Sequence, residues 1–293
     1  MSQQQYVPLH LHTEYSLLDG AIRTGQLCAF AKENNMPAVA ITDHGVMYGA
    51  LDLYIHAKDI GVKPLIGCEF YVTTGDIKDK SQNNREYFHL VLIAKNETGY
   101  KNLIKLVSIS QIDGFYYKPR INHELIKTYH EGLICLSACL QGEICQTLLK
   151  KSYKEAIGVA KFYKELFNDD YYLEIQDHGL MEQKRTNPDI IKIGKELNIP
   201  LVITNDSHYL KKEDSNWHDT LLCIQTNSLK DDTNRFRFSN DEFYVKTVDE
   251  LRESFKWLDS DTFNEAIENT VKVADKCHLI IELGKSFLPP FDV

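Results

Sequence analysis

The chain has 293 residues, of which 43% are hydrophobic and 26% are charged, and its formal net charge is −9. This composition indicates one large or two ordinary globular domains, and it excludes a disordered chain and a disulfide-dependent mini-domain. The negative charge excludes a broadly basic surface for nucleic acid. Any contact with nucleic acid must therefore be local or assisted by bound cations.

The sequence carries no signal for export or membrane insertion. No apolar run approaches the roughly 18 residues that a membrane span needs, and the first residues form neither the basic nor the apolar region of a signal peptide. The seven cysteines include no C-x-x-C pair, which disfavours a disulfide framework or a zinc ribbon. We therefore expect a cytoplasmic protein without membrane contacts.

Short apolar runs alternate with amphipathic stretches over the first two thirds of the chain, which predicts strands separated by helices. The predicted strands span residues 7–12, 38–42, 64–69, 87–94, 132–137, 171–175 and 201–205. The predicted helices span residues 25–34, 50–60, 101–110, 154–166 and 187–197. This alternation predicts a parallel sheet, closed most economically into a βα barrel. An open doubly wound sheet is the alternative, but no GxGxxG turn follows the first strand.

The pattern changes after residue 209, where helices continue without strong strands. Thr247-Val-Asp-Glu250 is a capping box that begins one helix, and residues 261–276 predict another. We expect the polar segment 74–86 to be a mobile loop. The predicted units are a barrel core over 1–209, a helical extension over 210–285 and a linker over 286–293.

Histidines, carboxylates and a cysteine gather at the ends of the predicted strands. His10 and His12 lie two residues apart on a strand, so both imidazoles point to the same side, as a shared metal requires. Taken singly, each residue has a common structural explanation: a turn carboxylate, or a buried core histidine or cysteine. Barrel enzymes build their sites on one rim, however, so the whole set predicts a site there. The set is His10, His12, Asp19, His44, Glu69, His89, Cys139, Asp206 and His208.

The chemistry of these donors indicates a reaction class. Imidazole, carboxylate and thiolate together suit zinc and similar first-row ions better than calcium or magnesium. Nine donors are too many for one tetrahedral ion, which indicates a multinuclear site. Such sites activate water and hold both oxygens of an in-line displacement at phosphorus. We infer phosphoester hydrolysis, in which the metal ligands and no other side chain carry the catalysis.

Seven short motifs resemble those of the PHP (polymerase and histidinol phosphatase) family. They are His10-x-His12, Ser-Leu-Leu-Asp19-Gly, Ile-Thr-Asp43-His44-Gly, Ile-Gly-Cys-Glu69, Tyr-Phe-His89-Leu, Leu-Ser-Ala-Cys139-Leu and Thr-Asn-Asp206-Ser-His208-Tyr. The framing segments Gly-Phe-Tyr-Tyr-Lys118-Pro-Arg120-Ile and Glu174-Ile-Gln-Asp-His178-Gly-Leu make the resemblance closest to the amino-terminal PHP domains of bacterial replicative DNA polymerase alpha subunits. The resemblance covers essentially the whole chain.

The resemblance implies a distorted (β/α)7 barrel of the α/β class, with a C-terminal helical appendage and three divalent ions. These would be Zn²⁺ or Mn²⁺, with Mg²⁺ or Fe²⁺ as alternatives. By resemblance, the three ligand sets are His10, His12, Glu69 and Asp206; Glu69, His89 and Cys139; and Asp19, His44 and His208. The implied activity is 3′–5′ exonuclease proofreading of single-stranded or frayed DNA ends. The polymerase domains would lie beyond the predicted linker.

Further residues are weaker candidates for contact with substrate. Lys118 and Arg120 could contact phosphate, although a solvated loop pair explains them equally well. His178 could support the ligands or touch substrate, and Tyr116 and Tyr117 could stack on an unpaired base. The remaining histidines are expected at the surface: His56, His123, His130, His218 and His278.

Two other classes of function remain open. The barrel could be a structural module that supports the polymerase and binds a separate proofreading subunit or other replisome subunits, with metals that only stabilise the fold. Alternatively, it could be a pyrophosphatase or a small-molecule phosphatase. The polymerase-like framing segments disfavour the small-molecule phosphatase.

Overall fold

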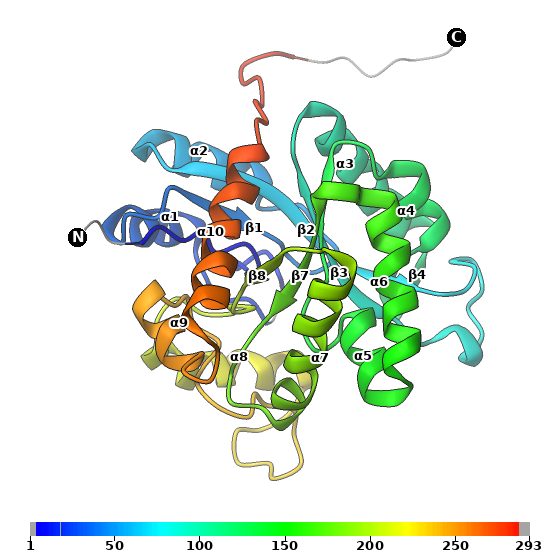
Figure 1. The fold of residues 1–293 in the computed structure, drawn as a ribbon. Helices are drawn as coiled ribbons and strands as arrows, with labels where there is room; N and C mark the ends of the chain where they lie inside the picture. Colours follow the sequence, from blue (N-terminus) through cyan, green and yellow to red (C-terminus); the bar gives the residue numbers. More distant parts are fainter. Residues whose placement is uncertain (1–3, 18, 287–293) are drawn as a thin grey trace.

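The computed structural model describes residues 4–17 and 19–286, and it combines a curled sheet with surrounding helices (Figure 1). The predicted linker, apart from residue 286, lies outside the described residues. The strands are β1 (Ala38–Ile41), β2 (Lys63–Thr73), β3 (Phe88–Ala94), β4 (Phe115–Tyr116), β5 (Lys118–Asn122), β6 (Leu133–Leu136), β7 (Tyr171–Ile175) and β8 (Leu201–Ile203). The helices are α1 (Thr24–Glu33), α2 (Ala50–Ile60), α3 (Glu97–Ile112), α4 (His123–Tyr129), α5 (Glu143–Lys150), α6 (Tyr153–Phe167), α7 (Met181–Leu197), α8 (Ser215–Thr226), α9 (Val248–Ser254) and α10 (Ser260–Lys276).

Six strands and one irregular segment form the wall of a distorted barrel. β2 pairs with β1 and β3, and the sheet continues through β6 and β7 to β8. Residues 8–12 close the gap between β1 and β8, because Thr42 N donates to Leu11 O at 3.2 Å and His12 N donates to Ser207 O at 2.8 Å. β5 pairs with the far end of β2, and β4 pairs with β5. The predicted α/β class and distorted barrel are confirmed.

One of the six strands in the barrel wall runs against the others, although the alternation of strands and helices predicted a parallel sheet. β3 is antiparallel to both β2 and β6. The connection from β2 to β3 holds only the short 3₁₀ turn Gln82–Asn84, whereas a parallel neighbour requires a long crossover, usually a helix. His89, opposite Tyr71, therefore lies at the amino end of β3. That end meets the carboxyl ends of the parallel strands on either side.

Residues 7–12 do not form the regular strand that we predicted. Pro8 has no N–H to donate to a neighbouring strand. The Leu11 N–H donates to the side-chain oxygen of Thr42 at 2.9 Å instead of to a backbone carbonyl. The segment therefore pairs with its neighbours through isolated bridges rather than a continuous ladder, and it still carries its two histidines to the barrel.

The barrel interior is apolar at one end and polar at the other. Alternate strand residues such as Leu65, Val91 and Tyr172 fill the apolar part, as the period-two geometry of strands requires. A second apolar layer lies between the strands and the surrounding helices. Further along the same interior-facing positions, polar residues such as Glu69 and Glu174 take over, and they are buried as well.

Helix α10 belongs to the predicted helical extension, yet it packs directly on the barrel. Lys63 Nζ at the start of β2 donates to Ala274 O at 2.6 Å, and Asn269 Nδ2 donates to Leu201 O at the start of β8 at 2.9 Å. Figure 1 shows α10 beside β8. Because these contacts are at the amino ends of parallel strands, α10 covers the apolar end and leaves the polar end to the site.

The predicted helices are present with shifted bounds, and three more appear. α3 begins at Glu97, where the Asn96 side chain accepts from Gly99 N at 3.0 Å as an N-cap. α7 begins at Met181, so Pro188 lies inside the helix. α4, α5 and α8 were not predicted. α4 and α5 have seven and eight residues, which is shorter than the window of about 11 residues in which helical periodicity is readable.

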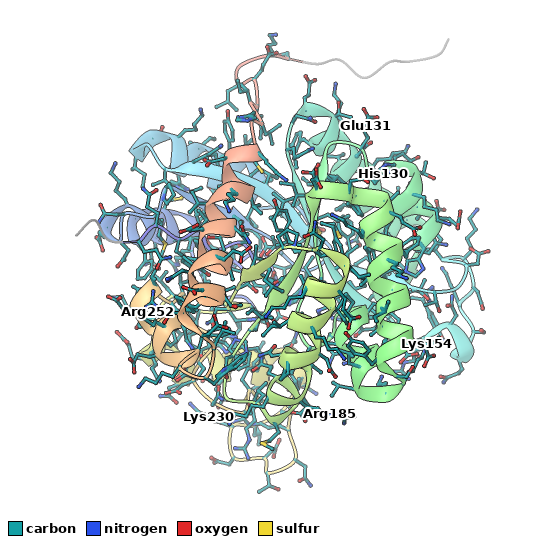
Figure 2. All side chains as sticks on the ribbon, viewed as in Figure 1. His130, Glu131, Lys154, Arg185, Lys230 and Arg252 are labelled. Atoms are coloured by element: carbon teal, nitrogen blue, oxygen red, sulfur yellow. The ribbon has the colours of Figure 1, made fainter. Side chains whose placement is uncertain are left out.

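Charged side chains cover the outside of the molecule. Figure 2 shows Lys154 on α6, Arg185 on α7 and Arg252 on α9 projecting away from the ribbon. Within the described part of the chain, no helix combines the length and apolar character that crossing a bilayer demands.

Candidate metal centre

The nine predicted ligands converge at the polar end of the barrel, with Glu69 at their centre. Glu69 Oε1 lies 2.8 Å from His89 Nδ1 and 3.1 Å from His10 Nε2. Its second oxygen, Oε2, lies 2.5 Å from His44 Nδ1. Cys139 Sγ lies 3.9 Å from Oε1. A single carboxylate, 1% exposed, therefore joins donors from four separate segments of the chain.

The remaining donors connect through Asp206 and His12. Asp206 Oδ1 lies 2.9 Å from His12 Nε2 and 3.3 Å from His10 Nε2. The His12 ring stacks on His44 with centroids 3.8 Å apart, and its centroid is 4.5 Å from that of His208. Asp19 and His44 complete the set, since Asp19 Oδ2 lies 3.4 Å from His44 Nε2.

Within this cluster, three groups of donor atoms are close enough to share an ion. In each group the donor atoms lie within 4.8 Å of one another: His12, His44 and His208; His10, His12 and Glu69; and Glu69, His89 and Cys139. The third group coincides with one of the expected ligand sets. Glu69 and His12 each belong to two groups, so one side chain could serve neighbouring ions.

Unusual backbone conformations present several of these donors. Gly45 has φ +62°, and its N–H donates to Glu69 O at 2.8 Å, which brings His44 alongside Glu69 of β2. Ala138, which precedes Cys139, has φ +64°, and Asp206 has φ +43°. Residues other than glycine are rarely found there, and such strain gathers at functional sites. The rim therefore carries local strain at the donor Asp206 and at Ala138, the residue before the donor Cys139.

Glu174, which was not assigned a role from the sequence, supports His10. Its Oε2 accepts from His10 Nδ1 at 2.8 Å and from Thr204 Oγ1 at 2.6 Å, while its Oε1 accepts from Ala138 N at 2.7 Å. With Nδ1 bonded in this way, Nε2 of His10 is left facing Glu69 and Asp206. A carboxylate behind a metal-binding histidine fixes its tautomer and orientation. The signal was available, because Glu174 faces inward near the end of β7.

Asp43 is a structural carboxylate, as its position in a turn suggested. It is buried and accepts from Thr13 N at 2.6 Å, from Thr13 Oγ1 at 2.8 Å and from Ser16 Oγ at 2.7 Å. Ser16 Oγ also lies 3.3 Å from His12 Nδ1. Asp43 therefore holds the turn after His12 rather than offering a free oxygen to the cluster.

The packed charges shift the pKa values of the cluster strongly. Burial alone would raise the pKa of Glu69, but the His89 and His44 charges outweigh it and hold that pKa well below its ordinary value. Burial and the neighbouring His44 and His208 lower the pKa of His12 to about 3. Burial lowers the pKa of His44, yet the charges of Asp19 and Glu69 reverse this and raise it to about 9. The Glu69 carboxylate is therefore ionised, whereas the His12 imidazole nearby is neutral.

The residues fit a bound metal ion. Among the described residues, three buried polar atoms at this site make no hydrogen bond: Asp19 Oδ1, His44 Nδ1 and Glu69 Oε2. The last two atoms are only 2.5 Å apart. Burial, Asp206 and Glu69 raise the pKa of the Cys139 thiol well above its ordinary value. A bound cation would satisfy the free lone pairs and favour the thiolate.

A pocket of about 660 Å³ opens onto the cluster. Proposed ligands line it, including His44, His89 and Asp206, together with Lys118 and His178. The Lys118 ammonium lies 5.0 Å from the centroid of the Tyr71 ring. Of the residues expected to contact substrate, Lys118 and His178 face the pocket.

Arg120 has a structural environment instead of a place in the pocket. Its buried guanidinium donates to Gly114 O at 3.1 Å and Asn84 O at 2.5 Å. It also donates to Ile77 O at 2.9 Å and Asp79 O at 3.2 Å. The phosphate contact expected for Arg120 is therefore wrong. Each of its hydrogen bonds anchors either the segment 74–86 or the turn before β4. Both are irregular backbone, whose carbonyls need donors from outside a helix or sheet.

Two histidines support the site from behind. His178 Nε2 donates to Asn205 O at 2.9 Å, and Nδ1 accepts from Gln183 Nε2 at 2.8 Å, so the ring braces the residue before Asp206. His218 was expected at the surface but is buried, and its Nε2 donates to Asp19 O at 2.7 Å. The reason is that α8, which carries His218, packs under the rim.

Comparison with known proteins agrees with this geometry. The family described as PHP domain matches residues 8–178. Three relatives named DNA polymerase III subunit alpha cover nearly the whole chain: from Campylobacter jejuni (46% identical, 98% of this chain, 24% of the relative), Borreliella burgdorferi (43%, 94% and 24%) and Treponema pallidum (43%, 100% and 25%). The chain thus spans about a quarter of the length of these relatives.

Solved structures are more distant. The structure of a two-domain protein containing a predicted PHP-like metal-dependent phosphoesterase, from Bacteroides vulgatus, aligns over 96% of this chain and 72% of that chain, with a TM-score of 0.43 and 12% identity. The family match covers more than half of the chain and includes every proposed ligand up to Cys139. The chain therefore belongs to the PHP domain family.

Proposed function

We propose that the chain is a metal-dependent phosphoesterase that removes nucleotides from the 3′ ends of single-stranded or frayed DNA. The observation that carries the proposal is the convergence of nine donor side chains, Glu69 among them, beside an open pocket. Three divalent ions, Zn²⁺ or Mn²⁺, would be held by the three ligand sets expected from the sequence. The name of the relatives, DNA polymerase III subunit alpha, supports DNA as the substrate.

Bound ions would activate a water molecule and neutralise negative charge on the phosphoryl oxygens. The side chains of this chain would hold the ions and keep their ligands in the correct orientation. Glu174 keeps Nε2 of His10 pointed at the cluster, and Asp43 holds the turn after His12. Lys118, which lines the pocket, would attract a phosphate that enters from solvent.

The remaining partners belong to the same proposal. The chain spans about a quarter of the length of its relatives, so in our proposal it is part of a longer subunit that also contains polymerase domains. Those domains would supply affinity for DNA, which the net charge of −9 on this chain opposes. Other replisome subunits, including a separate proofreading subunit, would contact the same assembly. We do not expect the 293 residues to polymerise DNA.

The test is nucleotide release from a labelled single-stranded oligonucleotide by the purified chain, first stripped of metal and then supplied with Mn²⁺ or Zn²⁺. We expect release from the 3′ end, and we expect Asp206→Asn and His12→Ala to abolish it. Asparagine tolerates the left-handed backbone at position 206, so Asp206→Asn isolates the loss of charge. Asp241→Asn and His130→Ala, outside the cluster, are the matched controls.

Two outcomes would contradict the proposal. If wild type and Asp206→Asn release nucleotides at the same rate, the activity belongs to a contaminant. If metal raises the melting temperature of the wild type but neither metal supports cleavage, the barrel is a structural module in which bound ions only stabilise the folded state.

A further inference from the structure

Three phenylalanines form an aromatic wall on the pocket that contains the cluster. Phe236, Phe238 and Phe243 all line this pocket. Phe236 is 56% exposed, so core packing does not account for it. Phe236 and Phe238 belong to the sequence Arg235-Phe-Arg-Phe238, in a segment without regular secondary structure. The wall is apolar surface in the same pocket as the histidines and carboxylates of the cluster. A ligand that carries both a flat apolar group and an anionic group would match this pocket.

The rings lead outward from the proposed ligands. The centroid of Phe238 lies 4.9 Å from that of His208, in an edge-to-face arrangement. Phe238 lies 4.4 Å from Phe243 and 6.1 Å from Phe236. His208 is therefore in ring contact with Phe238, which is in turn next to the exposed Phe236. Two phenylalanine rings, Phe236 and Phe238, would separate a flat ligand stacked on Phe236 from His208.

The segment that carries the wall is held in place before any ligand arrives. Arg235 makes a two-point ion pair with Asp219 of α8, with both N–O distances 2.6 Å. Asn240 Nδ2 donates to His178 O at 2.6 Å. Arg235 is therefore turned toward α8, while its neighbours Phe236 and Phe238 line the pocket. Such an arrangement reduces the entropy lost when a ligand binds.

Cationic side chains from other segments line the same pocket. Arg85 comes from the connection between β2 and β3, Lys118 from β5 and Lys150 from the end of α5. Lys150 pairs with Glu86 at 3.0 Å. Among the described residues, no ion pair is found for Lys118, whose ammonium lies over the Tyr71 ring. One pocket thus combines an aromatic surface, cations and a cluster suited to phosphoester chemistry.

We infer that the aromatic wall stacks against the unpaired 3′-terminal nucleobase of single-stranded DNA while the adjacent phosphodiester reaches the cluster. Every nucleobase has a π-face, so stacking would accept all four bases and would reject a paired end whose bases are already stacked. Lys118 and Arg85 would contact phosphates further along the strand. The inference rests on the proposed function, and it assigns the base-binding surface to Phe236 and Phe238 in place of Tyr116 and Tyr117. Those two tyrosines are not among the residues that line the pocket.

The test uses the full 293-residue chain with Mn²⁺ and short single-stranded oligonucleotides. One oligonucleotide carries the fluorescent base 2-aminopurine at its 3′ end, beside a phosphorothioate linkage that slows cleavage. Stacking on the wall should quench its fluorescence on binding. Phe236→Leu should remove most of the quench and weaken binding by about tenfold, as expected for one base–aromatic stack. Phe236→Trp, which restores an aromatic face, should recover both.

Two controls separate stacking from unfolding and from failure of the reaction. Tyr48→Leu removes a ring of similar exposure, 62%, that lies outside the pocket lining, and it should change neither quench nor affinity. An oligonucleotide with an abasic 3′ end should bind wild type about tenfold more weakly, with Phe236→Leu binding the two DNAs alike.

The outcomes distinguish this inference from the proposed function. Quench without any nucleotide release would contradict the phosphoesterase proposal and leave the base-binding surface standing. Equal binding of base-bearing and abasic ends by wild type, or a full quench by Phe236→Leu, would overturn the base-binding surface whether or not nucleotides are released. Failure of wild type to bind either DNA would overturn both.

Discussion

Glu174 and His10 are joined by a buried hydrogen bond of 2.8 Å between Oε2 and Nδ1, and both side chains are fully enclosed. Glu174 also accepts from Ala138 N and Thr204 Oγ1, so it needs both carboxylate oxygens. Glutamine offers one acceptor oxygen, and at least one of these donors would then face an NH₂ group. We expect Glu174→Gln to lower metal affinity by about 10- to 100-fold, the usual effect of losing a carboxylate behind a histidine ligand.

Competition between the protein and a chromophoric chelator measures that affinity. Glu165→Gln, on the exposed face of α6, is the matched control. A Glu174→Gln variant that binds metal as tightly as wild type would show that His10 does not need the bond.

Cys139 provides a spectroscopic prediction. Without a cation its thiol is protonated, because burial and the Asp206 and Glu69 charges raise its pKa well above the ordinary value. Binding of Co²⁺ in place of the native ion should convert it to the thiolate. We expect an ultraviolet thiolate-to-cobalt charge-transfer band that is absent from Cys139→Ser. The six other cysteines stay in that variant and serve as the internal control; a band that persists would assign the thiolate to one of them.

His178 predicts a loss of stability in mild acid. The neutral ring is required, since Nε2 donates to Asn205 O while Nδ1 accepts from Gln183, and burial lowers the pKa of His178 to about 4. Below pH 6.5, the ordinary pKa of histidine, His178 is protonated in the unfolded chain but stays neutral in the folded chain. The free energy of unfolding therefore decreases as pH falls from about 6.5 to 4. The contribution is on the order of 3 kcal/mol.

Urea unfolding of the metal-free protein at pH 7 and pH 4.5 measures this effect. His178→Gln should be less stable than wild type at pH 7, and its loss of stability between the two values should be smaller. Carboxylates such as Asp206, whose pKa His10 and His12 hold well below normal against burial, act in the same direction in both proteins. Identical losses in wild type and His178→Gln would refute the assignment.

Arg120 predicts a stability defect without a direct effect on phosphate binding. Its guanidinium donates to four backbone carbonyls, and lysine cannot reproduce this planar fork. We expect Arg120→Lys to destabilise the protein by about 2–3 kcal/mol, because buried carbonyls lose their donors. Urea unfolding measures the change, with the exposed Arg237→Lys as control. A fully stable Arg120→Lys that binds DNA poorly would restore the phosphate contact expected from the sequence.

The sequence could predict the convergence of donors because of one geometric rule. Strands that run in parallel end on the same rim, so Glu69, at the end of the predicted strand 64–69, and Asp206, shortly after β8, had to approach each other. β2 itself continues past Glu69 to Thr73. The rule needed only strand ends, which the apolar runs mark well. The rule does not predict strand direction. β3 is antiparallel to its neighbours, so His89 reaches the rim from the beginning of its strand and not from the end.

The rest depended on tertiary contacts that leave a weak mark on local sequence. From the sequence, Arg120 resembles a solvated cation in a loop. In the structure, backbone carbonyls of residues 77–84 accept hydrogen bonds from it and bury it. His218 resembles a surface residue until α8 packs beneath Asp19. Phe236 and Phe238 lie in a segment with no periodic pattern, so their place on the pocket follows from the Arg235–Asp219 ion pair and not from a strand or helix.

The reversed strand also makes one connection available for protein engineering. Pairing with β2 on one side and β6 on the other sets the register of β3. A label attached to the exposed side chain of Lys80 would leave the loop backbone, which Arg120 holds at Asp79 O, and the position of His89 unchanged. One extra residue between His89 and Leu90 would instead turn the imidazole to the outer face of the sheet. Position 80 is therefore a suitable attachment point for a tag or a fluorophore.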